Sequence, residues 1–149
     1  MNSPRDPALL HRTLQRAWTL WAALLATLVV YLALAEWLGP LAEWPFGRRD
    51  PLLLYGVTGL WVAAAWGLRR VLLRPGPGGQ GPAAARYLVA VVAPLALCET
   101  AAVLALVLML LGLPPDTGRG LVLVAALGML PLRPRRTELE RLLAGRPPG

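Results

Sequence analysis

Long apolar runs constrain this chain more than any other feature of its sequence. A helix must hold about 20 consecutive apolar residues to cross the roughly 30 Å hydrocarbon core of a bilayer. The run Trp18–Leu38 reaches this length and is interrupted only by Glu36 near its end. Three further apolar runs follow it, and apolar residues make up 56% of the 149 residues. These runs predict an all-α membrane protein.

Four transmembrane helices are predicted, at about residues 17–38, 52–68, 87–113 and 120–132. The second run is short for a span, whereas the third is long enough to cross with tilt, even with a kink at Pro94. The fourth run has 13 residues. This is too few for a comfortable crossing, so a re-entrant or interfacial segment is the alternative.

The four helices are expected to form one transmembrane domain over residues 1–149. A cytoplasmic N-terminal extension, 1–16, precedes the first apolar run, and an amphipathic tail, 133–149, follows the fourth. Asp6 and Pro7 have the residue types of an N-cap and a first helical turn. The first helix is therefore expected to begin in water, near residue 7.

The tail 133–149 has the pattern of a short helix. Thr137 and Glu140 have the spacing of a capping box, and three leucines share one face: Leu139, Leu142 and Leu143. Such a helix can lie on the inner leaflet, where its arginines meet anionic lipid. A frayed, charged tail is the alternative.

The arginines predict the orientation of the helices. All fifteen basic residues are arginine, and they stand at the ends of the apolar runs. If all four runs cross, twelve arginines lie on the side of both termini and three on the other side: Arg48, Arg49 and Arg119. Because cytoplasmic loops carry an excess of basic residues, we predict a multi-pass protein of the bacterial inner (plasma) membrane with both termini cytoplasmic.

The N-terminus has a second interpretation. Three arginines precede the first apolar run, and the small residues "ALA" stand at 33–35, within its last part. This is also the outline of a cleaved signal peptide, although the apolar stretch is long for one. Cleavage would leave three helices and place the mature N-terminus outside.

Several function classes find no support in the sequence. A net charge of +7 would suit nucleic acid only on a basic patch of a soluble surface, and here the arginines flank apolar runs. The single cysteine, Cys98, and the single histidine, His11, form no metal-ligand set. The glycine-rich segment 76–81 lacks the lysine of a phosphate-binding loop, so we interpret it as a turn. We expect no cofactor, metal, nucleic-acid partner or catalytic site.

One carboxylate, Glu99, lies near the middle of the third apolar run. A charged side chain at bilayer depth costs at least about 2.5 kcal/mol on insertion, so an intramembrane carboxyl is a functional candidate. Three roles are open to it: a neutral acid that ties helices together, a proton or cation site, and a contact with a partner subunit. Glu36, in contrast, lies at the outer end of the first run, where solvation explains it.

Counting to the middle of each run places Thr27 and Thr58 at the level of Glu99. A Thr–Glu–Thr cluster between helices is therefore predicted, and these three residues form the candidate ion or proton site. Small residues near Glu99 would permit close helix packing: Ala96, Ala102 and Ala105. A second packing face is expected at three glycines of the second run: Gly56, Gly59 and Gly67.

The stretch "ALCETAAVLALV" has a spacing found in a known family. A carboxylate is followed three residues on by alanine, six on by a small residue and eight on by valine: Glu99, Ala102, Ala105 and Val107. With the preceding loop of arginine and proline, residues 52–113 resemble the proteolipid c subunit of rotary ATP synthases, a two-helix hairpin. The resemblance implies an oligomeric ring with Glu99 as its proton or sodium site.

The first and fourth runs have no counterpart in that hairpin. The whole chain is also similar to small uncharacterised four-span bacterial membrane proteins, a resemblance that implies no activity. Two functions are predicted. The first is an accessory or assembly subunit of a membrane complex, in contact with lipid and with a membrane-protein partner or further copies of itself. The second is an oligomer that moves protons or cations through Glu99.

Overall fold

The computed structural model of the chain describes residues 7–41, 43, 51–74 and 82–143, and these residues form helices and their connections. The elements follow one another as α1 (Pro7–Leu38), α2 (Pro51–Leu72), α3 (Ala83–Leu110), α4 (Pro115–Met129), a 3₁₀ turn η1 (Leu130–Leu132) and α5 (Arg136–Leu143). The predicted all-α fold is confirmed for this part of the chain. Asp6, Arg48, Arg49 and the predicted turn at 76–81 lie outside the described residues.

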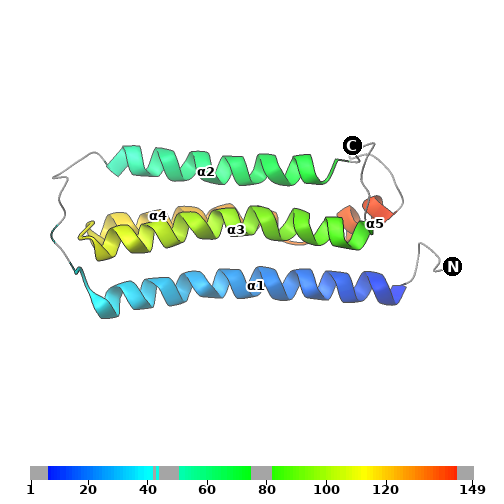
Figure 1. The fold of residues 1–149 in the computed structure, drawn as a ribbon, viewed down its shortest axis with the longest axis horizontal. Helices are drawn as coiled ribbons and strands as arrows, with labels where there is room; N and C mark the ends of the chain where they lie inside the picture. Colours follow the sequence, from blue (N-terminus) through cyan, green and yellow to red (C-terminus); the bar gives the residue numbers. More distant parts are fainter. Residues whose placement is uncertain (1–6, 42, 44–50, 75–81, 144–149) are drawn as a thin grey trace.

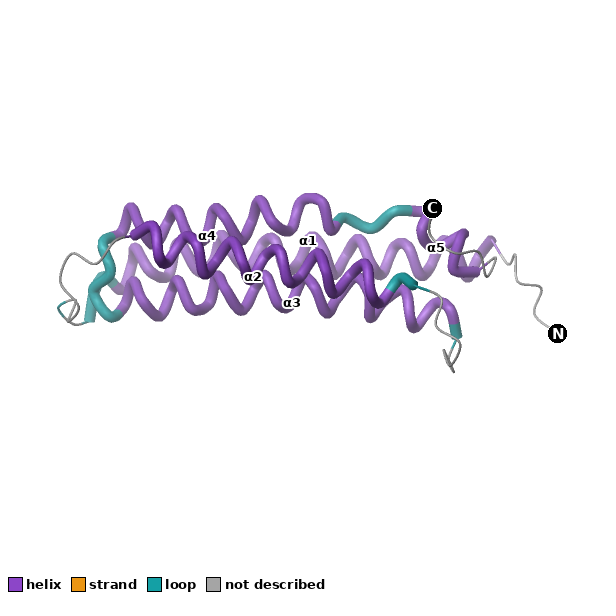
Figure 2. Tube along the Cα trace, turned by 90° about the horizontal axis from the view of Figure 1, so that it is seen from above, coloured by secondary structure: helices purple, strands orange, loops and turns teal. Residues whose placement is uncertain are grey.

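The four longer helices form an antiparallel bundle in which successive helices run in opposite directions (Figure 1). α3 is the central helix and packs against α1, α2, α4 and α5. α1 and α2 lie on opposite sides of the α3–α4 pair (Figure 1), and the view from above separates α3 from α4 (Figure 2). A residue on α1 and a residue on α2 at one level are therefore held apart by the bundle interior.

Three helices, α1, α2 and α3, are long and apolar enough to cross a membrane, α1 over Ala8–Leu38. This confirms the first three predicted spans. α4 begins at Pro115, five residues before the predicted start at 120. The signal was present in the sequence, since proline suits the first helical position and Asp116 favours the first turn. The fourth crossing itself stays a prediction.

α2 also extends further than predicted, through Arg69 to Leu72 rather than ending at 68. Every third or fourth residue of α2 is buried, which gives one stripe against α3 and α4: Thr58, Val62, Ala65 and Arg69. Arg69 is thus a buried helical residue, although the sequence counts it among the arginines of a cytoplasmic loop. The opposite face of α2 is exposed.

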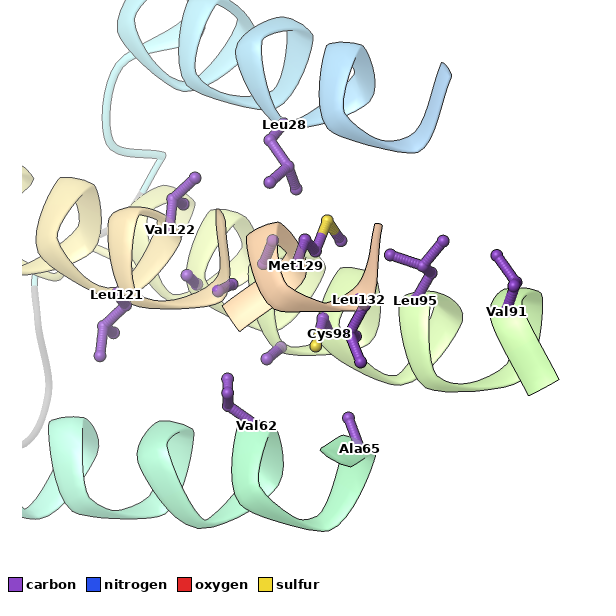
Figure 3. Packing of buried hydrophobic residues seen from close by; sticks show 14 of the residues in the cluster. Leu28, Val62, Ala65, Val91, Leu95, Cys98, Leu121, Val122, Met129 and Leu132 are labelled. Atoms are coloured by element: carbon purple, nitrogen blue, oxygen red, sulfur yellow. The ribbon is translucent and has the colours of Figure 1, made fainter. Parts of the chain in front are cut away.

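One apolar cluster fills the interior of the bundle. Figure 3 shows side chains of several helices pointing into it, among them Leu28, Val62, Leu95 and Met129. Small residues let α3 approach its neighbours, and the predicted packing positions Ala102 and Ala105 are buried, whereas Ala96 is exposed. Pro94 lies inside α3, which continues as one helix across it.

Glycines of α4 lie where it approaches neighbouring helices closely, as two of them show. A Cβ atom on Gly128 would lie 2.6 Å from Val62 Cγ1 of α2, and one on Gly118 would overlap the Met109 side chain of α3. Neither position has room for a larger residue unless its neighbour moves. These contacts explain how a helix of only 15 residues packs tightly in the bundle.

The C-terminal tail packs on the bundle. Leu139 of α5 is completely buried and belongs to the apolar cluster, and α5 contacts α3 and α1. The expectation that this helix lies on the inner leaflet with its leucines in lipid is therefore corrected for Leu139, which is covered by protein. Glu140 pairs with Arg136 at 2.6 Å rather than forming the expected capping box with Thr137.

Candidate functional site

Glu99 lies at the interface of α3 and α1, where two hydroxyl groups meet its carboxyl. Tyr31 Oη and Thr27 Oγ1 each lie 3.0 Å from the same oxygen, Glu99 Oε1. Thr27 and Tyr31 are four residues apart on α1, so they stand on one face, one turn above the other. All three side chains are partly buried. Thr27 and Glu99 are thus brought together as predicted, and Tyr31 is an additional member.

The geometry of these contacts restricts where the protons can lie. Thr27 Oγ1 is 2.7 Å from the Leu24 carbonyl oxygen as well as 3.0 Å from Glu99 Oε1. A threonine hydroxyl has one proton and a carbonyl only accepts. The single Thr27 proton is therefore shared between the two oxygens, or Glu99 is a neutral acid that donates its own proton to Thr27. Tyr31 can donate to Oε1 in either state, so the neutral acid is the form in which Thr27 does not have to share its proton.

Thr58, the third predicted member, does not join this cluster. It is buried on α2, in the stripe that faces α3 and α4, and no hydrogen bond between Thr58 and Glu99 is present in the described structure. α2 lies on the far side of the α3–α4 pair from α1 (Figure 1). The Thr–Glu–Thr cluster is therefore corrected to Thr27–Glu99–Tyr31. Its role as an ion or proton site stays a prediction.

A second polar cluster, centred on Arg69, stands where α2 meets the tail. Arg69 donates from Nη2 to Glu138 Oε2 at 2.6 Å and to the Arg133 carbonyl at 3.1 Å, and from Nη1 to the Leu132 carbonyl. The side chains of Arg69 and Glu138 are only 7% and 22% exposed. Nearby, the Tyr87 hydroxyl donates to the Arg135 carbonyl and accepts from the Arg135 amide. These bonds fix the tail to the bundle.

Side-chain donors also reach the carbonyl groups at the end of α4. A helix leaves its last four carbonyls without partners, and in a bilayer each unsatisfied group costs several kcal/mol. Pro131 has no amide hydrogen, so α4 ends there in the turn η1. Trp66 Nε1 donates to the Gly128 carbonyl at 2.9 Å, and Trp21 Nε1 to the Met129 carbonyl at 3.1 Å. Both tryptophans are therefore hydrogen-bonded inside the protein.

At the opposite end of the bundle, α1 and α4 are joined by an ion pair. Arg119 Nη2 lies 2.9 Å from Glu36 Oε1, and about half of each side chain is exposed. The expected exposure of Glu36 at the end of its helix is confirmed. Its pairing with Arg119 is not evident from the sequence, because Glu36 lies near the end of the first apolar run and Arg119 lies in the connection before the fourth. A small pocket beside this pair is lined in part by Gly112 and Leu113.

α2 presents an exposed face of small residues on the outside of the bundle. Gly59, Ala63 and Gly67 are four residues apart, so they form one stripe along the helix, and all three are exposed. A Cβ atom added at Gly59 or at Gly67 would have open space around it, with no atom of another helix within 4 Å. These two glycines therefore mark no packing face within the described part of the chain. We call the three residues the α2 small-residue stripe.

The described residues contain no group of three His, Cys, Asp or Glu side chains that could hold a metal ion. Cys98 is a buried free thiol at the centre of the apolar cluster. Comparison with protein-family models, with curated proteins and with solved structures finds no match to this chain.

Proposed function

We propose that this chain is an accessory or assembly subunit of a membrane complex, with no catalytic site of its own, and that the α2 small-residue stripe docks a transmembrane helix of another subunit. The stripe carries the proposal, since Gly59, Ala63 and Gly67 are exposed and none of the described helices covers them. In lipid, apolar surface alone provides little drive for helices to associate. Small residues four apart let two backbones approach closely and gain van der Waals contact.

The Glu99 site supports a structural role in the same proposal. Its two hydroxyl partners come from α1, and the hydrogen-bond geometry suits a neutral acid. Such a group ties α1 to α3 in the way that polar side chains join helices in membranes. No transport chemistry is required of it.

A four-crossing topology with cytoplasmic termini belongs to the proposal. α4 and η1 together are about 28 Å long at 1.5 Å per α-helical and about 2 Å per 3₁₀ residue, close to the hydrocarbon thickness of roughly 30 Å. Backbone carbonyl groups inside a bilayer need hydrogen-bond donors from the protein, and Trp66 and Trp21 supply them to Gly128 and Met129. Arg119 and the Arg69 cluster then lie on opposite sides of the membrane.

Photocrosslinking in native membranes tests the docking. Ala63 is replaced by the photoreactive residue p-benzoylphenylalanine, and Ala64, equally exposed but about 100° around the helix, provides the matched control. We expect a discrete adduct with another membrane protein from position 63 and none from 64. Gly59→Leu, which fills the stripe, should abolish that adduct, whereas Leu60→Ala should leave it.

The other outcomes contradict the proposal. Equal adducts from both positions would mean non-specific contact with neighbouring proteins. No protein adduct at position 63 would mean that the stripe faces lipid. An adduct of twice the chain's mass would identify a second copy as the occupant, and would favour an oligomer over an accessory subunit.

A second candidate function, translocation of protons or cations by an oligomer, also has an observation in its favour. Both described hydrogen bonds to the carboxyl reach Oε1, and Glu99 is partly exposed, so Oε2 is left for a further partner. The resemblance to the rotary c subunit fits this candidate. Under it, Glu99→Gln abolishes proton flux into liposomes while expression and oligomer size are unchanged. Wild-type protein without flux contradicts it.

A further inference from the structure

A groove lies between α1 and α3 near the beginning of α1, away from the sites described above. Its lining is basic and polar at one end and apolar at the other: Arg12, Gln15, Arg16, Thr19, Leu20 and Leu88. Five of these residues belong to α1, and Leu88 belongs to α3. We call this feature the α1–α3 groove.

The two arginines of the α1–α3 groove have no acidic partner in the described part of the chain. Arg12 and Arg16 are exposed, and the ion pairs present there involve other arginines: Arg69, Arg119 and Arg136. Residues four apart on a helix are neighbours, so the two positively charged guanidinium groups repel each other. A bound anion between them would turn this repulsion into attraction.

The polarity of the groove changes in order along α1. Arg12 and Arg16 come first and Thr19 follows, and the apolar Leu20 lies about 12 Å from Arg12 along the helix axis. The apolar Leu88 of α3 completes the lining. A phospholipid has the same order, from a charged phosphate through ester oxygens to acyl chains. A free phosphate ion would match only the first part.

The groove also lies at the expected membrane level. Trp18 and Trp21 form an edge-to-face pair one to two turns further along α1, with ring centroids 5.3 Å apart. Tryptophans gather at the headgroup level of membranes, and Trp18 remains partly exposed. Arginines just outside such a pair lie among lipid phosphates, and basic pockets between transmembrane helices suit anionic headgroups.

We propose that the α1–α3 groove binds an anionic phospholipid. The phosphate lies between the guanidinium groups of Arg12 and Arg16, which donate charge-assisted hydrogen bonds to its oxygens. The Gln15 side chain donates to a remaining phosphate or ester oxygen, and an acyl chain packs on Leu20 and Leu88. The Thr19 hydroxyl donates to the Gln15 carbonyl at 3.0 Å, so Thr19 lines the groove without donating to the lipid. Lipid bound in this way would brace α1 against α3 on the side of the Arg69 cluster.

Native mass spectrometry of the full chain in detergent tests this site. Three probes are added in turn: phosphatidylglycerol, phosphatidylcholine and inorganic phosphate. We expect phosphatidylglycerol to be retained roughly 25-fold more strongly than phosphatidylcholine, since each of the two arginines contributes about fivefold near anionic lipid. The double variant Arg12→Gln/Arg16→Gln should lose this preference.

The control double variant, Arg70→Gln/Arg133→Gln, removes the same charge from exposed positions near the end of α2 and just before α5. The end of α2 and α5 both lie at the end of the bundle where α1 begins (Figure 1). The control variant should keep the preference and the melting temperature of the wild type. The proposal is overturned if the Arg12/Arg16 variant retains the preference, or if both double variants lose it equally, which would mean a general charge effect. Binding of inorganic phosphate as strong as that of phosphatidylglycerol would assign the site to a free anion instead.

Discussion

Thr27 of α1 and Glu99 of α3 are 72 residues apart in the chain and are joined by a hydrogen bond of 3.0 Å. Tyr31 adds a second bond of the same length to the same carboxyl oxygen. The result is a carboxyl group between two long apolar helices whose nearest polar partners are hydroxyls. Its properties follow from whether it is a neutral acid or a carboxylate.

If Glu99 is a neutral acid that joins α1 to α3, its substitution by glutamine should hardly change the stability of the protein. The amide can accept from Tyr31 and donate to Thr27, so Glu99→Gln is expected to change the unfolding free energy by less than about 0.5 kcal/mol. Glu99→Leu leaves both hydroxyls without their partner and should cost about 1 kcal/mol. Thermal unfolding in detergent micelles, followed by circular dichroism, measures both. Thr100→Val is the control, because the exposed Thr100 hydroxyl bonds only to its own helix.

A stabilising effect would contradict this role. If Glu99→Gln or Glu99→Leu raised the melting temperature by several degrees, the wild-type carboxyl would be a buried charge whose removal is favourable. The neutral tie would then have to be abandoned.

The close approach of α4 to α2 at Gly128 should be visible as steric coupling. Gly128→Ala places a Cβ 2.6 Å from Val62 Cγ1, so a loss of roughly 1 to 3 kcal/mol in stability is expected. Val62→Ala removes the clashing methyl groups, so the double variant should be more stable than the sum of the two single effects predicts. Gly59→Ala, with open space around its Cβ, should not destabilise. Additive effects at 128 and 62 would refute the contact.

The Arg69–Glu138 pair should contribute more to stability than the exposed pair beside it. Arg69→Met removes donors to Glu138, Leu132 and Arg133, and is expected to cost about 3 kcal/mol. Arg136→Met breaks the bond to Glu140 where both partners are largely exposed, and should cost less than about 0.5 kcal/mol. Chemical denaturation in mixed micelles compares the two. Equal losses would argue against burial of Arg69.

The tryptophans that donate to the end of α4 provide a further test. Trp66→Phe and Trp21→Phe keep an aromatic ring but leave the Gly128 or Met129 carbonyl without that donor. Each is expected to cost about 1 to 2 kcal/mol. Trp37→Phe is the control, because the Trp37 side chain is 81% exposed. Backbone amide exchange of α4 should rise in the first two variants only.

Much of the bundle follows from the sequence, because apolar run length predicts α1, α2 and α3 directly. The level of a residue along its helix can also be counted from the sequence, and this count places Thr27 at the level of Glu99. The direction in which a side chain points around its helix cannot be predicted in this way, since it depends on which helices are neighbours. Thr58 has the right level but lies on α2, across the α3–α4 pair from Thr27, and Tyr31 was missed although it lies one turn from Thr27 on the same face.

Arg69 shows a second limit of sequence patterns. An arginine after an apolar run normally marks a loop beside the membrane, and only the fold reveals that Glu138, 69 residues later, meets it. The glycines of α2 were recognised as a packing feature, but their exposure on the outside of the bundle is a property of helix arrangement. The proposed docking of another subunit rests on this exposure.

The proposed four-crossing topology is central, because the placement of both termini on the cytoplasmic side depends on it. In a Cys98→Ala background, single cysteines are introduced by Asp116→Cys in the first turn of α4 and by Arg141→Cys in α5, both at exposed positions. A membrane-impermeant maleimide is then applied to intact spheroplasts. We predict labelling of position 116 at once and of position 141 only after permeabilisation. Labelling of both positions from one side would contradict the fourth crossing, and the reverse pattern would contradict the orientation.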